Sequence, residues 1–134
     1  MDTMQKIKQT IVVEWKHLDK DGTTCDRCAE TGNEIRRTLS VLQQECGPKG
    51  VEIVLMETLL SANNIGDSNL ILINGKPLAE LLPNAVSAEN SCCSCSDLIG
   101  KETCCRTIVR FGMTHEAVPA HFIREAICGV ARCC

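Results

Sequence analysis

The sequence is poor in aromatic residues, with no Tyr, one Trp and two Phe. Proteins that bind single-stranded nucleic acid stack the bases on aromatic side chains, so this scarcity argues against such a role. A net charge of −3 and a pI near 5.6 also leave no basic surface for a phosphate backbone. We therefore predict no nucleic-acid partner.

Long apolar runs are missing as well. No stretch approaches the length of a membrane-spanning helix. The first residues, MDTMQKIKQTIVVEW, have neither the hydrophobic region nor the small-residue cleavage site of a signal peptide. No glycine-rich phosphate loop is present, and the GDSN stretch at 66–69 is not a nucleophile elbow. These absences predict a cytoplasmic protein without a membrane partner.

Cysteine, in contrast, is abundant, with 11 in 134 residues. Six of them form the adjacent pairs Cys92–Cys93, Cys104–Cys105 and Cys133–Cys134. A disulfide between two adjacent cysteines would close a strained small ring. The chain also has enough Leu, Ile and Val for an ordinary hydrophobic core. A secreted disulfide scaffold is therefore disfavoured. In a reducing compartment, cysteine clusters usually indicate metal or redox chemistry.

Hydrophobic periodicity predicts one α/β domain over residues 1–134, in which strands and helices alternate. The expected elements are strands at 11–17, 51–57 and 69–73, a helix from Cys25 to Gly47 with Thr24 as N-cap, a short helix at 59–65, a hairpin at 106–118, and a helix from Pro119. The first two strands should be parallel, because a helix intervenes. Whether the residues after Asn74-Gly75 or the later hairpin supply a fourth strand stays open. A cysteine-rich loop is expected at about 83–105, and a flexible tail at 131–134.

The motif CDRC, from Cys25 to Cys28, opens the first predicted helix. This position places the first sulfur beside unsatisfied backbone N–H groups, at the positive end of the helix dipole, which lowers the pKa of its thiol. We predict Cys25 as the nucleophile and Cys28 as the resolving cysteine. Asp26 opposes this shift and Arg27 favours it, so their balance stays open. The alternative is a pair of buried structural cysteines.

A second cluster follows later in the chain and comprises Cys92, Cys93, Cys95, Cys104 and Cys105. Cys92 and Cys95 make another CxxC, which together with Cys104 and Cys105 offers the four thiolates of a tetrahedral zinc site. Softer ions such as As(III), Hg(II) or Cu(I) also select thiolates. The alternatives are a disulfide relay with CDRC, a structural zinc loop on a partner-binding module, or reactive thiols without a role.

The remaining candidates have simpler interpretations. Cys46 and Cys128 recur at helical apolar spacing and are predicted core residues. Cys133 and Cys134, in the predicted tail, could deliver a metal, shuttle a disulfide or do neither. The three histidines, His17, His115 and His121, lack the spacing of a helical metal pair and are expected to be structural.

Four stretches of the chain resemble an uncharacterised family of small prokaryotic proteins, a domain of unknown function assigned to the thioredoxin-like superfamily. These stretches are EWKHLDKDGTTCDRC, LILINGKPL, CCSCSDLIG and CCRTIVRFGMTHEAVPAHFIREAI, and the resemblance runs from about Ile11 to Ile127. It implies a thioredoxin-like fold, with Cys25 and Cys28 as the redox pair and Cys93, Cys95 and Cys105 as recurring thiols. Thioredoxins carry a cis-proline before the third strand, whereas this chain has IGDSNLIL there. The adjacent cysteines also resemble those of thioredoxin-fold arsenic metallochaperones.

Together, the residues and the resemblance predict a thioredoxin-like α/β protein with a central mixed sheet flanked by helices. The predicted function is thiol–disulfide redox chemistry at Cys25 and Cys28, which would make the protein a thiol–disulfide oxidoreductase. The alternative is a binding protein or chaperone for zinc or another thiophilic metal or metalloid. The expected partner is accordingly a redox protein or a thiophilic ion.

Overall fold

The structure is a computed structural model that describes residues 8–20, 22–61, 67–91, 96, 99–100 and 104–134, without the side chains of 26–27, 89–91 and 104–105. These residues form a mixed α/β fold with two sheets. None of its helices in these ranges is long and apolar enough to cross a membrane.

The larger sheet contains β1 (Gln9–Leu18), β2 (Val51–Leu60), β3 (Leu70–Ile73) and β4 (Lys76–Pro77), in the order β2-β1-β3-β4. Strands β1 and β2 pair in parallel over their whole length, as predicted. Strand β3 runs antiparallel to β1, and β4 turns back on β3. The central sheet is therefore mixed, and the residues after Asn74-Gly75 form its fourth strand directly.

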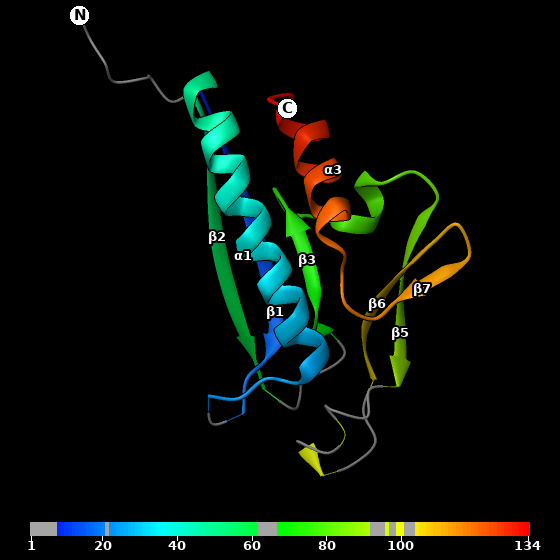
Figure 1. Cartoon of the computed structure of the whole chain (residues 1–134). Coiled ribbons are helices and arrows are strands. Elements are labelled where there is room, and N and C mark those ends of the chain that lie inside the picture. Colours follow the sequence, from blue (N-terminus) through cyan, green and yellow to red (C-terminus); the bar gives the residue numbers. More distant parts are fainter. Residues whose placement is uncertain (1–7, 21, 62–66, 92–95, 97–98, 101–103) are drawn as a thin grey trace, which may run out of the picture.

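Two helices, α1 (Asp26–Cys46) and α3 (Ala120–Ala131), lie over one face of this sheet (Figure 1). On β1, the alternate residues Ile11, Val13 and Trp15 are buried beneath them. Helix α1 carries Gly32 at the point where the Trp15 ring approaches, and a Cβ atom at this position would collide with that ring. The core therefore lies between the helices and the sheet.

The second sheet contains β5 (Ala85–Ser91), β6 (Cys104–Arg110) and β7 (Met113–His115), and all its pairings are antiparallel. The β6–β7 turn confirms the predicted hairpin. The prediction of a cysteine-rich loop at about 83–105 is wrong at both ends, because Ala85–Ser91 forms β5 and β6 begins at Cys104. The sequence AVSAENS has few large apolar side chains, and its backbone pairing with β6 makes it a strand. Arg110 and Glu125 join this sheet to α3 with a bidentate ion pair at 3.0 and 2.7 Å.

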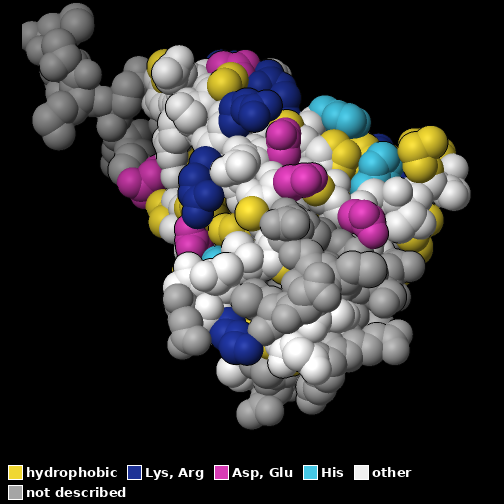
Figure 2. Space-filling view, turned by 60° about the horizontal axis from the view of Figure 1, so that its bottom comes forward, with side chains coloured by type: hydrophobic (Ala, Val, Ile, Leu, Met, Phe, Trp, Pro, Cys, Tyr) yellow, Lys and Arg dark blue, Asp and Glu magenta, His cyan; other side chains and the backbone are white. Residues whose placement is uncertain are grey.

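Two further boundaries differ from the predictions. The short helix expected at 59–65 is wrong at its start, because Leu59 and Leu60 extend β2 opposite β1, while residues 62–66 lie outside the described ranges. The N-cap of α1 is Cys25 rather than Thr24, and no side chain caps this end. On the surface shown in Figure 2, basic and acidic side chains are interspersed rather than gathered into patches of one sign.

Candidate functional site: a dithiol at the start of helix α1

The CDRC motif lies at the N-terminal end of α1. Cys25 is the N-cap, in an extended conformation, and its carbonyl accepts the N–H of Ala29 at 2.9 Å. Its side chain therefore leaves the backbone where the N–H groups of the first helical turn lack partners within the helix. The positive end of the helix dipole favours a thiolate at this position.

Both thiols of the motif are buried. The exposed fraction is 1% for Cys25 and 0% for Cys28, and neither takes part in a disulfide. Sulfur Sγ of Cys28 lies 3.0 Å from the hydroxyl oxygen of Ser68, close enough for a hydrogen bond. The same oxygen accepts the N–H of Leu18 at 2.9 Å, at the end of β1. Ser68 thus connects the motif to the end of the central strand.

The surroundings of Cys28 favour its protonated form. A hydrogen bond with Cys25 raises the pKa of Cys28 far above its ordinary value of 9.0, and burial raises it further. The Ser68 hydroxyl opposes this shift without cancelling it. Because its pKa is raised, Cys28 remains a protonated thiol near neutral pH.

Ser68 is a site residue that the sequence did not reveal. It belongs to the GDSN stretch, which has no recognisable catalytic motif, and it lies two residues before β3. This is the stretch in which a thioredoxin would carry its cis-proline, and no peptide bond between described residues is cis. Only its place in the chain could have indicated this contact, because a residue just before β3 lies near the end of β1 and the start of α1.

The cysteine-rich cluster is only partly described. Cys92, Cys93 and Cys95 lie outside the described residues, and Cys104 and Cys105 begin β6 with side chains that are not described. Cross-strand pairing nevertheless places Ser91 opposite Cys104. The segment between them therefore leaves and re-enters the sheet at neighbouring positions.

Strand β6 also contacts the dithiol site through the backbone. The N–H of Arg106 donates to the carbonyl of Ser68 at 2.8 Å. Arg106, the residue after Cys105, is thus hydrogen-bonded to Ser68, whose side chain contacts Cys28. The part of β6 that directly follows Cys105 therefore lies beside Ser68.

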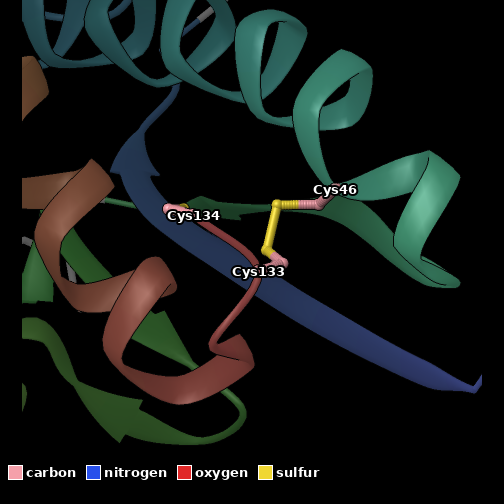
Figure 3. A group of neighbouring side chains, drawn as sticks. All are labelled: Cys46, Cys133 and Cys134. Carbon is pink, nitrogen blue, oxygen red and sulfur yellow. A yellow bond between two sulfur atoms is a disulfide. The ribbon is translucent and has the colours of Figure 1, made fainter.

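The C-terminal cysteines differ from their predictions. Cys133 forms a disulfide with Cys46 (Figure 3). Cys134 forms one with Cys128, so the tail predicted to be flexible is covalently held. Arg132 adopts a left-handed conformation at the end of α3 and turns the chain back toward α1. Cys46 is fully buried, as a core residue would be, and Cys128 is half-buried, but both are bonded.

The histidines have surroundings that agree with structural roles. His17 is buried, stacks on Trp15 at 3.9 Å between ring centroids, and lies 3.4 Å from a carboxylate oxygen of Glu57. His115 and His121 contact the ring of Phe122 edge-on.

Comparison with known proteins places the chain among relatives without an assigned activity. A family model described as "Domain of unknown function (DUF2703)" matches residues 11–127. An uncharacterized protein of Archaeoglobus fulgidus is 33% identical over 98 residues, which cover 70% of this chain and 69% of the archaeal one. No solved structure matches the chain.

Proposed function

Since the chain belongs to this family of unknown function, we propose from its own geometry that it is a thiol–disulfide redox protein with a thioredoxin-like fold. The observation that carries the proposal is the group formed by Cys25, Cys28 and Ser68 at the start of α1. It combines an attacking sulfur at a helix N-terminus with a partner thiol one turn later.

The arrangement of elements supports the fold assignment. A parallel β1–α1–β2 unit carries the CxxC at the start of its helix, an antiparallel β3–β4 pair follows, and α3 closes the chain. Both helices lie over the same face of the mixed sheet (Figure 1). The β5–β6–β7 sheet is then an insertion between β4 and α3.

The proposed reaction transfers two electrons from the dithiol to a substrate disulfide. The thiolate of Cys25 attacks one substrate sulfur, which breaks the substrate disulfide, forms a mixed disulfide and releases a thiolate. Cys28 then gives up its proton and attacks the sulfur of Cys25. The second substrate thiol leaves, and Cys25 and Cys28 remain joined as a disulfide. A dithiol partner, or the thiols of the 92–105 segment, would reduce that disulfide again.

Burial of Cys25 adds a condition to this scheme. With 1% of its surface exposed, this residue cannot meet a protein disulfide unless the chain around it opens. Alkylation of Cys25 should accordingly be slow in the folded protein and limited by this opening. The proposal also places the protein in a reducing cytoplasm, where Cys25 and Cys28 would begin as thiols.

The test is an equilibrium of the protein with buffers of dithiol and disulfide across a range of potentials, followed by acid quenching and mass spectrometry. Trypsin cleaves after Arg27, so a Cys25–Cys28 bond joins two peptides that are otherwise separate. We expect this linked pair to appear at a defined potential. Cys28→Ala should accumulate a mixed disulfide on Cys25, and Cys25→Ala should accumulate none on Cys28. If no potential links the two peptides, the cysteines are structural and the proposal fails.

A second candidate function is binding of a thiophilic ion by Cys92, Cys93, Cys95, Cys104 and Cys105. The pairing of Ser91 with Cys104 favours it, since both ends of the segment start from neighbouring strand positions. Native mass spectrometry of anaerobically purified protein tests this function. A bound metal should be lost when the five cysteines are replaced by Ser, and metal-free protein would refute it.

A further inference from the structure

Four cysteines gather at the end of the molecule where α1 and α3 both terminate. Cys46 is the last residue of α1, Cys128 lies near the end of α3, and Cys133 and Cys134 follow the turn at Arg132. The sulfur atoms of Cys46, Cys133 and Cys134 all lie within 4.8 Å of one another (Figure 3), and the sulfur of Cys128 is bonded to that of Cys134.

Three of these sulfurs, those of Cys46, Cys133 and Cys134, already have spacings near those in a thiolate metal centre. Zinc–sulfur bonds of about 2.3 Å in a tetrahedron place the sulfurs about 3.8 Å apart. Sulfurs 4.8 Å apart would have to approach by about 1 Å, and the sulfurs now bonded at 2.03 and 1.91 Å would have to separate by about 1.8 Å. Cys128 lies outside the group of three and enters the centre only when its bond to Cys134 opens. The group is also accessible from one side, because Cys134 is exposed while Cys46 and Cys133 are buried.

The charges around this site act in opposite directions on a cation and on the thiolates that would hold it. The C-terminal end of a helix carries partial negative charge, and two such ends meet here. Glu45, which precedes Cys46 in α1, is paired with Arg124 at 2.6 and 2.8 Å. Lys49 donates to the carbonyl of Cys133 at 2.8 Å. Its positive charge would partly offset the net negative charge of a centre made of one divalent cation and four thiolates.

We propose that the reduced form of this cluster binds one thiophilic divalent cation of the zinc class through Cys46, Cys128, Cys133 and Cys134. Each of the two disulfides takes two electrons and two protons from a dithiol reductant, which itself becomes a disulfide. The cation then displaces the four thiol protons into solvent. A disulfide oxidant reverses the process, forms the Cys46–Cys133 and Cys128–Cys134 bonds, and releases the metal. This site is independent of the redox activity proposed for CDRC.

The first test uses the full chain, reduced without oxygen and freed of metal by chelation. One equivalent of Zn²⁺ is added, the cysteines are alkylated, and fragmentation of the intact chain identifies the modified positions. We expect alkylation of the four clustered cysteines to slow by about tenfold or more, whereas Cys25 and Cys28 keep their rates. Oxidation by diamide should release the metal. If the metal protects only residues 92–105, or protects no cysteine, the proposal is wrong.

A pair of variants provides the second test. Cys133→Ser/Cys134→Ser removes two of the four ligands, and we expect loss of the zinc-dependent protection at Cys46 and Cys128. Cys25→Ser/Cys28→Ser is the matched control at the other end of α1 and should bind metal as the unmodified chain does. Unchanged protection in the first variant would overturn the proposal. If that variant does not fold, the alkylation pattern of the unmodified chain still decides the outcome.

Discussion

The two ends of α1 both carry buried cysteines, yet they favour opposite chemistry. Cys25 caps the N-terminal end, where partial positive charge stabilises a thiolate. Cys46 ends the helix about 30 Å away, where partial negative charge disfavours one. The helix dipole therefore favours a thiolate at the first end, whereas the second end holds a disulfide.

Burial does not cause this difference, because Cys28 and Cys46 both have exposed fractions of 0%. The difference comes from the side chains that surround each cysteine. Cys28 lies between the thiol of Cys25 and the hydroxyl of Ser68, so its proton has defined partners. Cys46 faces other cysteine sulfurs brought back by the turn at Arg132. The reactivity of a cysteine in this fold thus depends on which elements its helix end meets.

The largest predicted effect concerns the disulfide at the C-terminal end of α1. Cys46→Ala/Cys133→Ala should lower the free energy of unfolding by about 4–5 kcal/mol, because the bond joins residues 87 positions apart. Cys128→Ala/Cys134→Ala should lower it by only about 2 kcal/mol, because its bond spans six positions. Denaturant unfolding under non-reducing conditions measures both. Equal losses would show that loop closure is not the source of the stability.

The next prediction concerns the N-terminal end and its pH dependence. In the folded chain the raised pKa keeps Cys28 protonated, whereas in the unfolded chain the thiol loses its proton near its ordinary pKa of 9.0. Its contribution to stability is therefore complete below pH 9 and falls above it, by about 1.4 kcal/mol per pH unit. The reduced Cys28→Ala variant lacks this term. Unfolding free energies of both proteins, measured under reducing conditions from about pH 8 to 10.5, should diverge above pH 9. Parallel curves would contradict the assigned proton.

The smallest predicted effects concern two helix glycines, Gly32 where α1 packs on the sheet and Gly129 at an open position on α3. Gly32→Ala should lower the unfolding free energy by about 1–2 kcal/mol, because the new methyl group meets the Trp15 ring and overpacking outweighs the gain in helix propensity. Gly129→Ala, with no neighbouring atom near its added Cβ, should instead gain about 0.5–1 kcal/mol. Thermal unfolding of both variants measures the difference in sign. Stabilisation by both substitutions would mean that the ring moves aside freely.

Much of the fold could be predicted because its elements bury regular apolar patterns. Strands β1 and β2, helices α1 and α3, and the β6–β7 hairpin all follow periodicity or turn residues in the sequence. The dithiol was also predictable, since a CxxC after a strand and a turn places its first cysteine at a helix N-terminus. These features depend on residues that are neighbours along the chain.

The missed features depend on contacts between distant segments. Strand β5 exists through its pairing with β6, and its own sequence is too polar to indicate a strand. The disulfides join Cys133 to Cys46 and Cys134 to Cys128, a connectivity that spacing alone does not fix. Ser68 acquires its role only when β3 aligns beside β1.

The adjacency of Cys133 and Cys134 has a consequence for how the oxidised chain forms. Four clustered sulfurs allow three pairings, and closing a short loop loses less chain entropy than closing a long one. Of the two bonds in the folded chain, we therefore expect Cys128–Cys134, within the end of α3, to form before Cys46–Cys133, whose loop spans 87 positions. The final bond would then form only after α3 has docked against α1, so its appearance would report completion of the helix layer.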